Sequence, residues 1–456
     1  MGIGGSGMNA AAGIAHSLGY DVTGCDVKES EYTSDLVTKN IPIHYGHEES
    51  HLSDRELLCV SPAVYYSKAP EMEIGYAKMH EIPIKTWQQF MGEELQAGKK
   101  VIAVAGTKGK STTTSLVGLL LEKAELDPTV AVGASVTEWE KNYRVGKSDY
   151  FVCEADEFNN NFLHYKPDIA IITNLEMDHP EFFGSFEEYI TAYVNFVAQI
   201  TDKGILIVCL DSPGIVELLK RIDVNRVSVI TYGASDDAAY RLHSYTSENR
   251  ESHFVITHGD QNLSYVSLLT GEHNALNTVG AVALADVLKI PGTVFDTLLR
   301  TFRGIGRRFE LICEKNEIIV YNDYAHTPMS VRAVLKAARD QYRDARIWAV
   351  FQPHLYSRTK LFLDEFALSF GDANHVVISD IYASREKDKP IADEIHSQDL
   401  VDKIHELNPS IHVRYIGAVS DVVSSVLSDL KPGDVVVNMG AGDNGIISEE
   451  LCQKIQ

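Results

Sequence analysis

Short apolar runs alternate with amphipathic stretches along most of the chain. The runs VIAVAG, YFVCEAD, IAIITNLE and GILIVCL in residues 101–210 are nearly continuous in apolar side chains, and similar runs recur in residues 318–439. Buried parallel strands have this composition because helices cover both faces of their sheet. The pattern therefore predicts an α/β fold with parallel sheets. A polar alternating segment, residues 241–269, predicts antiparallel hairpins attached to the central sheet.

The chain divides into three blocks. A length of 456 residues fits about three domains, and the polar hinge QAGKK closes the first block just before Val101. We predict a Rossmann-like N-terminal domain over residues 1–98, a central domain over 99–312 that combines a parallel sheet with the small antiparallel segment, and a Rossmann-like C-terminal domain over 313–456.

Composition limits the expected partners and location. The net charge of -23 argues against a nucleic-acid-binding surface. No apolar run reaches membrane-spanning length and no apolar leader opens the chain, so we expect a cytoplasmic protein without a membrane partner. The six scattered cysteines include no C-x-x-C pair and so imply neither a zinc site nor a disulfide framework. Those in apolar runs, Cys59, Cys153 and Cys209, are expected to be buried, inert thiols.

The N-terminal GIGGSGM has Gly2, Gly4 and Gly7 in G-x-G-x-x-G register. Asp26 follows about 20 residues later, where this fingerprint places an acid for a ribose hydroxyl. The fingerprint leaves open whether the loop binds a nicotinamide cofactor or another nucleotide diphosphate. Since it normally follows a central strand, we expect that the native chain has residues ahead of Met1.

The stretch VIAVAGTKGKSTTT, residues 101–114, leads from an apolar strand through a glycine turn into a helix that begins with Gly-Lys-Ser. Backbone N–H groups and Lys110 suit phosphate binding, and the Ser111 hydroxyl suits Mg²⁺. The ordinary P-loop has glycine where this chain has Val104. Lys108 allows two interpretations, an additional phosphate contact or plain solvent exposure. The stretch predicts a central domain of the P-loop ATPase type.

Acidic motifs end two further apolar strands. EADE contains Glu154, Asp156 and Glu157, and TNLEMDH ends in Asp178 and His179. Ligands gather at the carboxyl ends of parallel strands, and Mg²⁺ prefers oxygen ligands. We therefore expect a magnesium site at this edge, the alternative for any single acid being a solvated strand end.

Other polar motifs lie at helix starts or strand ends. GEHNALN, residues 271–277, starts a helix, and its polar side chains could read a base or ribose or simply cap that helix. FRGIGRRFE supplies two adjacent arginines in an acidic chain. NDYAHTP and FQPHLYSRTK both follow apolar strands, and Arg358 in the second suits bidentate carboxylate or phosphate binding.

Taken in order, GIGGSGM, AGTKGKSTTT, EADE, TNLEMDH, GEHNALN, FRGIGRRFE, NDYAHTP and FQPHLYSRTK resemble the motifs of the Mur ligases over nearly the whole chain. The family's loop, G-T-x-G-K-[ST], needs no glycine at position 104. Within the family, GIGGSGM, EADE, GRRFE and FQPHLYSRT resemble the ligases that join L-alanine to the lactyl carboxylate of UDP-N-acetylmuramate. The resemblance implies ATP and Mg²⁺, an acyl phosphate intermediate, a closing C-terminal domain, and UDP rather than NAD at the first loop.

The resemblance also implies a role for each matched position. Lys110, Glu154, His179 and Arg358 would be catalytic, and Ser111, Glu154 and His179 would hold metal. ATP would lie against Gly106, Thr107, Lys108, Gly109, Lys110, Ser111, Thr112, His273, Asn274, Asn277, Arg308 and Asp323. The UDP substrate would lie near Gly4, Gly5, Ser6, Gly7 and Asp26. The amino acid would lie near Tyr324, His326, His354 and Arg358. We expect a monomer or homodimer.

Some positions depart from the family pattern. Lys108 stands where histidine is usual, Ser111 where threonine is usual, and EADEFNNNF differs from the commoner EADESDGSF. Tyr193 falls near the place where several Mur ligases carry a carbamylated lysine, and the lack of that lysine agrees with the alanine-adding members. Three alternatives remain: a ligase for a tripeptide or another amino acid, an NAD-dependent dehydrogenase built on the first loop, and a non-catalytic nucleotide-binding protein.

Overall fold

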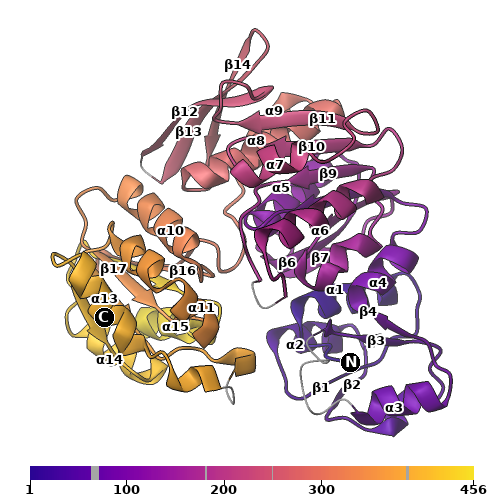
Figure 1. The fold of residues 1–456 in the computed structure, drawn as a ribbon, viewed down its shortest axis with the longest axis horizontal. Coiled ribbons are helices and arrows are strands. Elements are labelled where there is room, and N and C mark those ends of the chain that lie inside the picture. The colour runs from indigo at the N-terminus through magenta and orange to yellow at the C-terminus, as the bar shows by residue number, and fades with distance from the viewer. Residues whose placement is uncertain (63–70, 180–181, 249, 387–389, 456) are drawn as a thin grey trace. The chain divides into compact units, whose positions relative to one another are not determined.

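The structure is a computed structural model that describes residues 1–62, 71–179, 182–248, 250–386 and 390–455. Strands alternate with helices through most of this length, as the apolar pattern predicts (Figure 1). Contacts group the chain into two compact units. The first comprises Met1–Ser244, Phe254–Tyr265 and Leu276–Thr301, and the second comprises Tyr245–His253, Val266–Ala275 and Phe302–Gln456. The division into three domains at residues 98 and 312 stays a prediction.

The N-terminal block contains two separate parallel pairs of strands, β1 with β2 and β3 with β4. The strands are β1 (Gly24–Asp26), β2 (Ile43–Tyr45), β3 (Leu58–Val60) and β4 (Ile84–Thr86), and the helices are α1 (Ser6–Ser17), α2 (Glu31–Thr38), 3₁₀ helix η1 (Glu49–Leu52), α3 (Glu71–Met79), α4 (Trp87–Phe90) and π-helix η3 (Met91–Leu95). Apolar side chains of α1 and α2 pack on one side, and those around α3 and η1 on the other.

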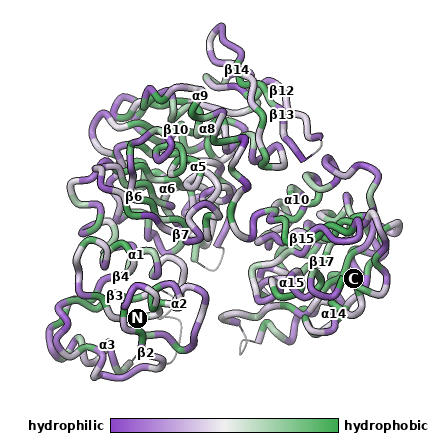
Figure 2. The backbone as a smooth tube through the Cα atoms, turned by 180° about the vertical axis from the view of Figure 1, so that it is seen from behind, coloured by the Kyte–Doolittle hydropathy of each residue, from purple (hydrophilic) through white to green (hydrophobic). Residues whose placement is uncertain are grey.

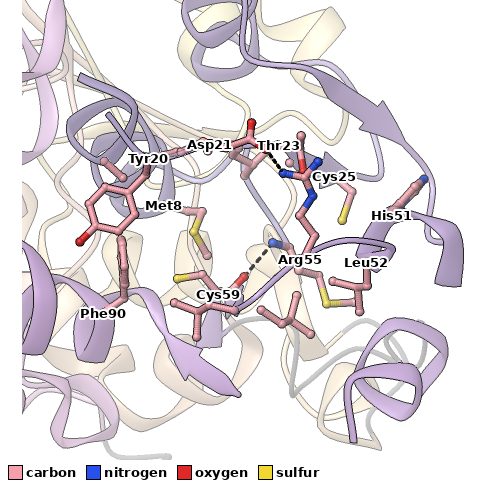
Figure 3. Close-up of a pocket in the computed structure, with 18 of the residues that line it drawn as sticks. Met8, Tyr20, Asp21, Thr23, Cys25, His51, Leu52, Arg55, Cys59 and Phe90 are labelled. Carbon is pink, nitrogen blue, oxygen red and sulfur yellow. Dashed lines mark hydrogen bonds and ion pairs between the residues drawn. The ribbon is translucent and has the colours of Figure 1, made fainter. Parts of the chain in front are cut away.

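The first three residues lie between β1 and β3. The Met1 ammonium donates to Cys59 O at 2.8 Å, Ser61 N donates to Met1 O at 3.0 Å, and Gly2 N donates to Cys25 O at 2.9 Å. A cavity of about 500 Å³ opens beside this junction, lined mainly by apolar side chains such as Met8 and Phe90 (Figure 3). The glycine loop is thus bonded to a strand on each side, although no strand precedes it among the described residues.

The central block contains a ten-stranded sheet in the order β14-β13-β12-β11-β10-β9-β5-β8-β6-β7. Its strands are β5 (Lys100–Ala105), β6 (Thr129–Val136), β7 (Lys141–Arg144), β8 (Tyr150–Glu154), β9 (Ile169–Ile172), β10 (Ile205–Cys209), β11 (Ser228–Gly233), β12 (Tyr240–Glu248), β13 (Glu251–His258) and β14 (Gln261–Ser267). Strands β8, β5, β9, β10 and β11 are parallel. The polar segment forms β12–β14, joined by hairpin-length connections.

Helices cover the central sheet. They are α5 (Lys110–Lys123), α6 (Phe186–Gln199), α7 (Pro213–Leu219), α8 (Glu272–Val287) and α9 (Gly292–Leu299). The apolar strands lie in the green, hydrophobic part of the tube around β10 in Figure 2, and Ile102, Val104 and Ile171 are at most 1% exposed. Val104, the residue in place of a P-loop glycine, is therefore a core residue of β5.

The C-terminal block contains a six-stranded sheet in the order β15-β16-β20-β17-β18-β19. The strands are β15 (Glu310–Lys315), β16 (Ile318–Asp323), β17 (Ile347–Phe351), β18 (His375–Ile378), β19 (His412–Tyr415) and β20 (Val435–Met439), and the α-helices are α10 (Pro328–Gln341), α11 (Tyr356–Leu361), α12 (Leu363–Ala367), α13 (Ser397–Leu407), α14 (Val419–Leu427) and α15 (Gly445–Lys454). Only β15 is antiparallel to its neighbour. Apolar clusters lie on both faces, which confirms the predicted parallel α/β sheet.

The cysteines agree only in part with expectation. Cys153 and Cys209 are buried, and burial raises the pKa of each thiol to about 12. Cys59 is only partly buried. Cys313 and Cys452 form a disulfide, so the expectation of no disulfide is wrong for this pair. Their separation of 139 residues leaves no local pattern that could reveal the bond.

Within the described residues, none of the helices has both the length and the apolar composition needed to cross a membrane.

Candidate active site

The loop between β5 and α5 has the geometry of a phosphate-binding turn. Gly106 has φ +129° and Gly109 has φ +82°, a left-handed conformation that favours glycine. Gly109 is the residue immediately before α5, so the free N–H groups of that helix's first turn follow it directly. A side chain at Gly109 would approach Asn277 Oδ1 to 2.5 Å. The loop therefore offers backbone donors to an anion and brings Asn277 of α8 against it.

Three motifs meet at this loop because their strands are parallel neighbours. Strand β5 pairs with β8, which leads into EADE, and with β9, which leads into TNLEMDH. The carboxyl ends of the three strands therefore share one edge of the sheet. This arrangement brings together Lys110, Ser111 and the acids that the sequence assigned to the magnesium site.

Lys110 lies at the centre of this group. Its ammonium donates to Gly106 O at 2.7 Å and to Glu157 Oε2 at 2.8 Å, and it lies 3.8 Å from Asp156 Oδ1. Burial works to lower the pKa of Lys110, but the carboxylates of Glu157, Asp156 and Glu154 outweigh it and raise that pKa. The lysine is therefore a fixed positive charge at the phosphate loop.

Glu154 ties the start of α5 to β6. Its Oε2 accepts from Ser111 Oγ at 2.9 Å and from Gly133 N at 2.7 Å. The serine hydroxyl and this carboxylate, two of the predicted metal ligands, are thus in direct contact. Both offer the oxygen atoms that Mg²⁺ prefers.

A second group of possible ligands lies beside the first. One ligand atom each from Asp156, Glu157 and His179 lies within 4.8 Å of the others. Burial, reinforced by the charge of Glu157, raises the pKa of Asp156 to about 6. His179 has φ +54°, which is uncommon for a residue other than glycine, and its N–H donates to Asp178 Oδ1 at 2.8 Å. Crowded carboxylates of this kind are stabilised by a cation, so the donor set fits Mg²⁺.

Lys108 points to a protein carboxylate. Its Nζ lies 3.1 Å from Glu176 Oε2, and the two side chains are 29% and 30% exposed. Its backbone N–H donates to Asn174 Oδ1 at 3.0 Å, and Asn174 Nδ2 donates to Lys108 O at 3.0 Å. Neither of the two sequence interpretations included this pairing, which fixes the turn to the residues after β9.

The sequence interpretation also missed a buried hydroxyl relay behind the loop. Tyr189 of α6 donates to Glu157 Oε1 at 3.0 Å, and its hydroxyl lies 2.9 Å from Thr107 Oγ1 and 3.5 Å from Tyr193. Glu157 is fully buried. The relay holds the carboxylate that in turn holds Lys110. The only sequence signal was the pair of tyrosines four residues apart, which packing alone could explain.

The other predicted ATP-binding residues of this part of the chain lie in or near helices α5 and α8. Asn277 faces Gly109, as described above. Asn274 Nδ2 donates to Thr270 O at 2.8 Å, which ties the first turn of α8 to the residues before it, and the His273 ring lies against Gly271. Thr112 is buried in α5.

Arg308 and Asp323 lie together in the second unit. Asp323 is 4% exposed and accepts from Phe309 N at 2.7 Å and Ala325 N at 2.6 Å. Burial raises the pKa of this carboxyl, with the charge of Arg308 partly opposing the shift. Arg307 and Arg308 each place their guanidinium carbon 5.1 Å from the centre of the Tyr324 ring.

The four predicted amino-acid-site residues are brought together in the second unit. The His326 ring lies 5.0 Å from that of Tyr324 and 5.9 Å from that of His354. Arg358 of α11 is 4% exposed, and its Nη1 lies 3.2 Å from His354 Nδ1. Thr327 and Ser330 form a capping box that starts α10 directly after His326. Local capping and the strand ends thus position this cluster.

The N-terminal loop places its predicted residues around Asp26. Gly4 N donates to Asp26 Oδ2 at 2.7 Å, and Ser30 Oγ donates to Gly4 O at 3.3 Å. Ser6 O accepts from Asn142 Nδ2 at 2.6 Å, which ties the start of α1 to β7. Gly5 precedes α1 directly. A side chain at Gly7 would reach 2.2 Å from the Trp87 ring.

Three family models match the chain in succession. The model for the Mur ligase family, catalytic domain, matches residues 1–99, the Mur ligase middle domain matches 104–285, and the Mur ligase, glutamate ligase domain matches 307–442. The chain belongs to the Mur ligase family.

Two curated relatives that match over nearly their full length share one name. UDP-N-acetylmuramate–L-alanine ligase of Alkaliphilus metalliredigens is 37% identical over 453 residues, which cover 99% of this chain and 96% of that protein. The protein of the same name from Acetivibrio thermocellus is 36% identical, covering 97% of this chain and 92% of its own length. The crystal structure of UDP-N-acetylmuramate–alanine ligase from Thermotoga maritima has a TM-score of 0.84 at 28% identity, covering 99% and 97% of the two chains.

A second solved structure, a murein peptide ligase from Psychrobacter arcticus, has a TM-score of 0.72 at 24% identity and covers 99% of this chain and 97% of its own. That likeness shows the shared fold.

Proposed function

We propose that this protein is an ATP-dependent ligase that joins L-alanine to the lactyl carboxylate of UDP-N-acetylmuramate and releases ADP and phosphate. The relatives named for this reaction, matched over nearly their whole length, support the proposal. The observation that carries it is the meeting of Lys110, Ser111 and the EADE acids at one strand edge. Since ATP and nucleotide sugars are intracellular substrates, the proposal includes a cytoplasmic location.

The first step is phosphoryl transfer. An oxygen of the acceptor carboxylate attacks the γ-phosphorus of ATP, the bond to the bridging oxygen of ADP breaks, and an acyl phosphate forms. Such transfer is catalysed mainly by positioning and charge neutralisation. Lys110 supplies a positive charge held by Glu157, and the N–H groups at the start of α5 supply further donors.

Magnesium would be held by Ser111, Glu154 and His179, with Asp156 and Glu157 close to the histidine. When bound, it would offset negative charge on the phosphates. The contact of Ser111 with Glu154 and the raised pKa of Asp156 both support an oxygen-rich cation site.

The second step forms the amide. The L-alanine amine attacks the acyl carbon, gives a tetrahedral intermediate, and phosphate leaves with the former acyl oxygen. Arg358 suits the donor's α-carboxylate because a guanidinium binds a carboxylate through two parallel hydrogen bonds. Contact with His354 at 3.2 Å fixes the guanidinium. Tyr324 and His326 would complete the donor site.

The remaining predicted residues would bind nucleotides. Asn277 lies at Gly109 and so beside the proposed ATP phosphates, and Asn274, His273, Arg308 and Asp323 would take further parts of ATP. Gly4, Gly5, Ser6, Gly7 and Asp26 would bind the UDP of the acceptor. Because Asp26 is already bonded to Gly4 N, its effect on UDP would come through the shape of the loop as well as by direct contact.

A phosphate-release assay tests the proposal. Purified protein, ATP, Mg²⁺ and UDP-N-acetylmuramate are combined with L-alanine, glycine, L-serine or a peptidoglycan tripeptide. We expect the highest kcat/KM with L-alanine, and mass spectrometry should detect the UDP-N-acetylmuramoyl-L-alanine product. Turnover with the tripeptide alone would instead identify a recycling ligase. Tight NADH binding that UDP does not displace would favour a dehydrogenase, and no turnover with any donor would favour a non-catalytic role.

A further inference from the structure

A group of metal-binding side chains lies in the N-terminal block, away from the phosphate loop. We call it the N-terminal cluster; its members are Cys25, His47, His51 and Glu73. They come from four segments: β1, the turn after β2, η1 and α3. Several of them line the cavity in Figure 3, where Cys25 and His51 are labelled. The Mur ligase reaction proposed above uses none of them.

Three donors of the cluster converge: one ligand atom each from Cys25, His47 and Glu73 lies within 4.8 Å of the others, and His51 contacts the group through Glu73. Cys25 Sγ lies 3.1 Å from Glu73 Oε1 and 3.8 Å from His47 Nδ1. Glu73 Oε2 lies 2.7 Å from His47 Nδ1, and Glu73 Oε1 lies 3.0 Å from His51 Nδ1. With metal–ligand bonds of about 2.0–2.3 Å, neighbouring donors around tetrahedral zinc lie roughly 3.3–3.8 Å apart. The contacts among Cys25, His47 and Glu73 are therefore close to the spacing of a coordination shell, and His51 would complete it by moving from Glu73 Oε1 toward the ion.

Glu73 is a buried carboxylate that its neighbours stabilise. Burial works to raise the pKa of its carboxyl, but hydrogen bonds from Cys25, His51 and His47 outweigh burial and lower that pKa. The Glu73 side chain is only 1% exposed, and its ion pairs within the described part of the chain are those with His47 and His51. A buried carboxylate needs a compensating positive charge. A divalent ion with one thiolate and one carboxylate would supply that charge and form a neutral centre.

We propose that the N-terminal cluster is a closed zinc site of the structural kind. Cys25, His47 and Glu73 supply three ligands of the types that zinc prefers, and His51, now bonded to Glu73, would supply the fourth after a rotation of its side chain. Binding would release the thiol proton of Cys25 and any proton on the histidines. The ion would tie η1 and α3 to β1, the strand whose last residue, Asp26, bonds the nucleotide loop at Gly4.

The alternative is a proton-only network. Burial raises the pKa of the Cys25 thiol to about 12, so without metal it stays protonated and donates to Glu73. Metal titration separates the two possibilities because only zinc-type binding deprotonates the sulfur.

The test is cobalt titration of the full-length protein, purified without a histidine tag, stripped with a chelator and kept free of nucleotide. We expect one equivalent of Co²⁺ to produce a sulfur-to-cobalt charge-transfer band with the intense visible bands of tetrahedral cobalt, and Zn²⁺ to abolish them. The oxygen-rich phosphate-loop site cannot give the sulfur band, so failure here leaves the ligase proposal unaffected.

Variants test which cysteine gives the sulfur-to-cobalt band. Cys25→Ser should remove it, whereas Cys59→Ser, the matched change at another thiol lining the same cavity, should retain it. His51→Gln should weaken Zn²⁺ binding by at least roughly tenfold. Zinc should raise the Tm of the unaltered protein and of Cys59→Ser, but not of Cys25→Ser. Absence of a sulfur band in the unaltered protein, or its survival in Cys25→Ser, would overturn the proposal.

Discussion

Two glycine-rich loops open two helices of the first unit, and they differ in how they are held and charged. The loop before α5 follows the buried strand β5 and places Lys110 among three carboxylates. The loop before α1 is bonded to β1 and β3, beside a cavity, and its Gly4 N donates to the carboxylate of Asp26 in β1. Both lead into the N-terminus of a helix, whose first turn has free backbone donors, but only the first helix begins with a lysine held among carboxylates. The first is therefore suited to phosphoryl transfer and the second to holding a diphosphate without reaction.

The largest expected effect tests that difference in charge. Lys110→Ala should lower kcat by at least about 10³-fold, because it removes the positive charge at the transferred phosphate. It should also lower the Tm, since Glu157 remains fully buried without its partner. Phosphate-release kinetics and circular dichroism check both effects. Lys108→Ala is the matched control in the same loop and should keep most activity. Comparable activity of the two variants would contradict the assigned role.

The second prediction concerns the close packing of the loop before α1. A Cβ at Gly7 would lie 2.2 Å from the Trp87 ring, so Gly7→Ala should destabilise the protein by about 1–3 kcal/mol. It should also raise the KM for UDP-N-acetylmuramate more than that for ATP. Denaturant unfolding and steady-state kinetics provide the measurements. Gly75→Ala, in helix α3 where nothing lies within 4 Å, should be neutral or stabilising. Equal effects at the two glycines would show that Trp87 does not restrict the loop.

The sequence was sufficient to predict the parallel sheets and the meeting of three motifs. Near-continuous apolar runs such as VIAVAG require burial on both faces, and β8, β5 and β9 pair in parallel, so their terminal polar residues share an edge. It could not predict the partner of Lys108 or the relay from Tyr189 to Thr107. Those contacts join residues 68 and 82 positions apart and leave no periodic signal. The Cys313–Cys452 bond and the N-terminal cluster could not be predicted for the same reason, because they too join residues far apart in the sequence.

The third prediction adds a strand ahead of the loop before α1, so that both glycine-rich loops would follow a strand. Fusing a short strand of alternating valine and isoleucine ahead of Met1 should raise the Tm by on the order of a few degrees, because it would cover apolar side chains that line the cavity beside Met1. Thiol labelling of Cys59, which lines the cavity, should also slow. A glycine–serine extension of the same length is the control. Identical melting and labelling of the two extended proteins would show that the cavity does not accept a strand.

The smallest expected effect concerns Lys108. Its pair with Glu176 is about one-third exposed, so solvent screening limits its contribution to about 0–1 kcal/mol. Lys108→His should therefore change the Tm little, and histidine can still reach toward Glu176 as a donor. If Lys108 instead contacted phosphate, the change would remove a full charge and raise the KM for ATP strongly. We expect the KM for ATP to change by less than about fivefold, roughly what 1 kcal/mol allows. Glu176→Gln should have a similarly small effect, because the two side chains act as one pair. A large rise in the KM for ATP in the lysine variant alone would show that Lys108 contacts the phosphates and not only Glu176.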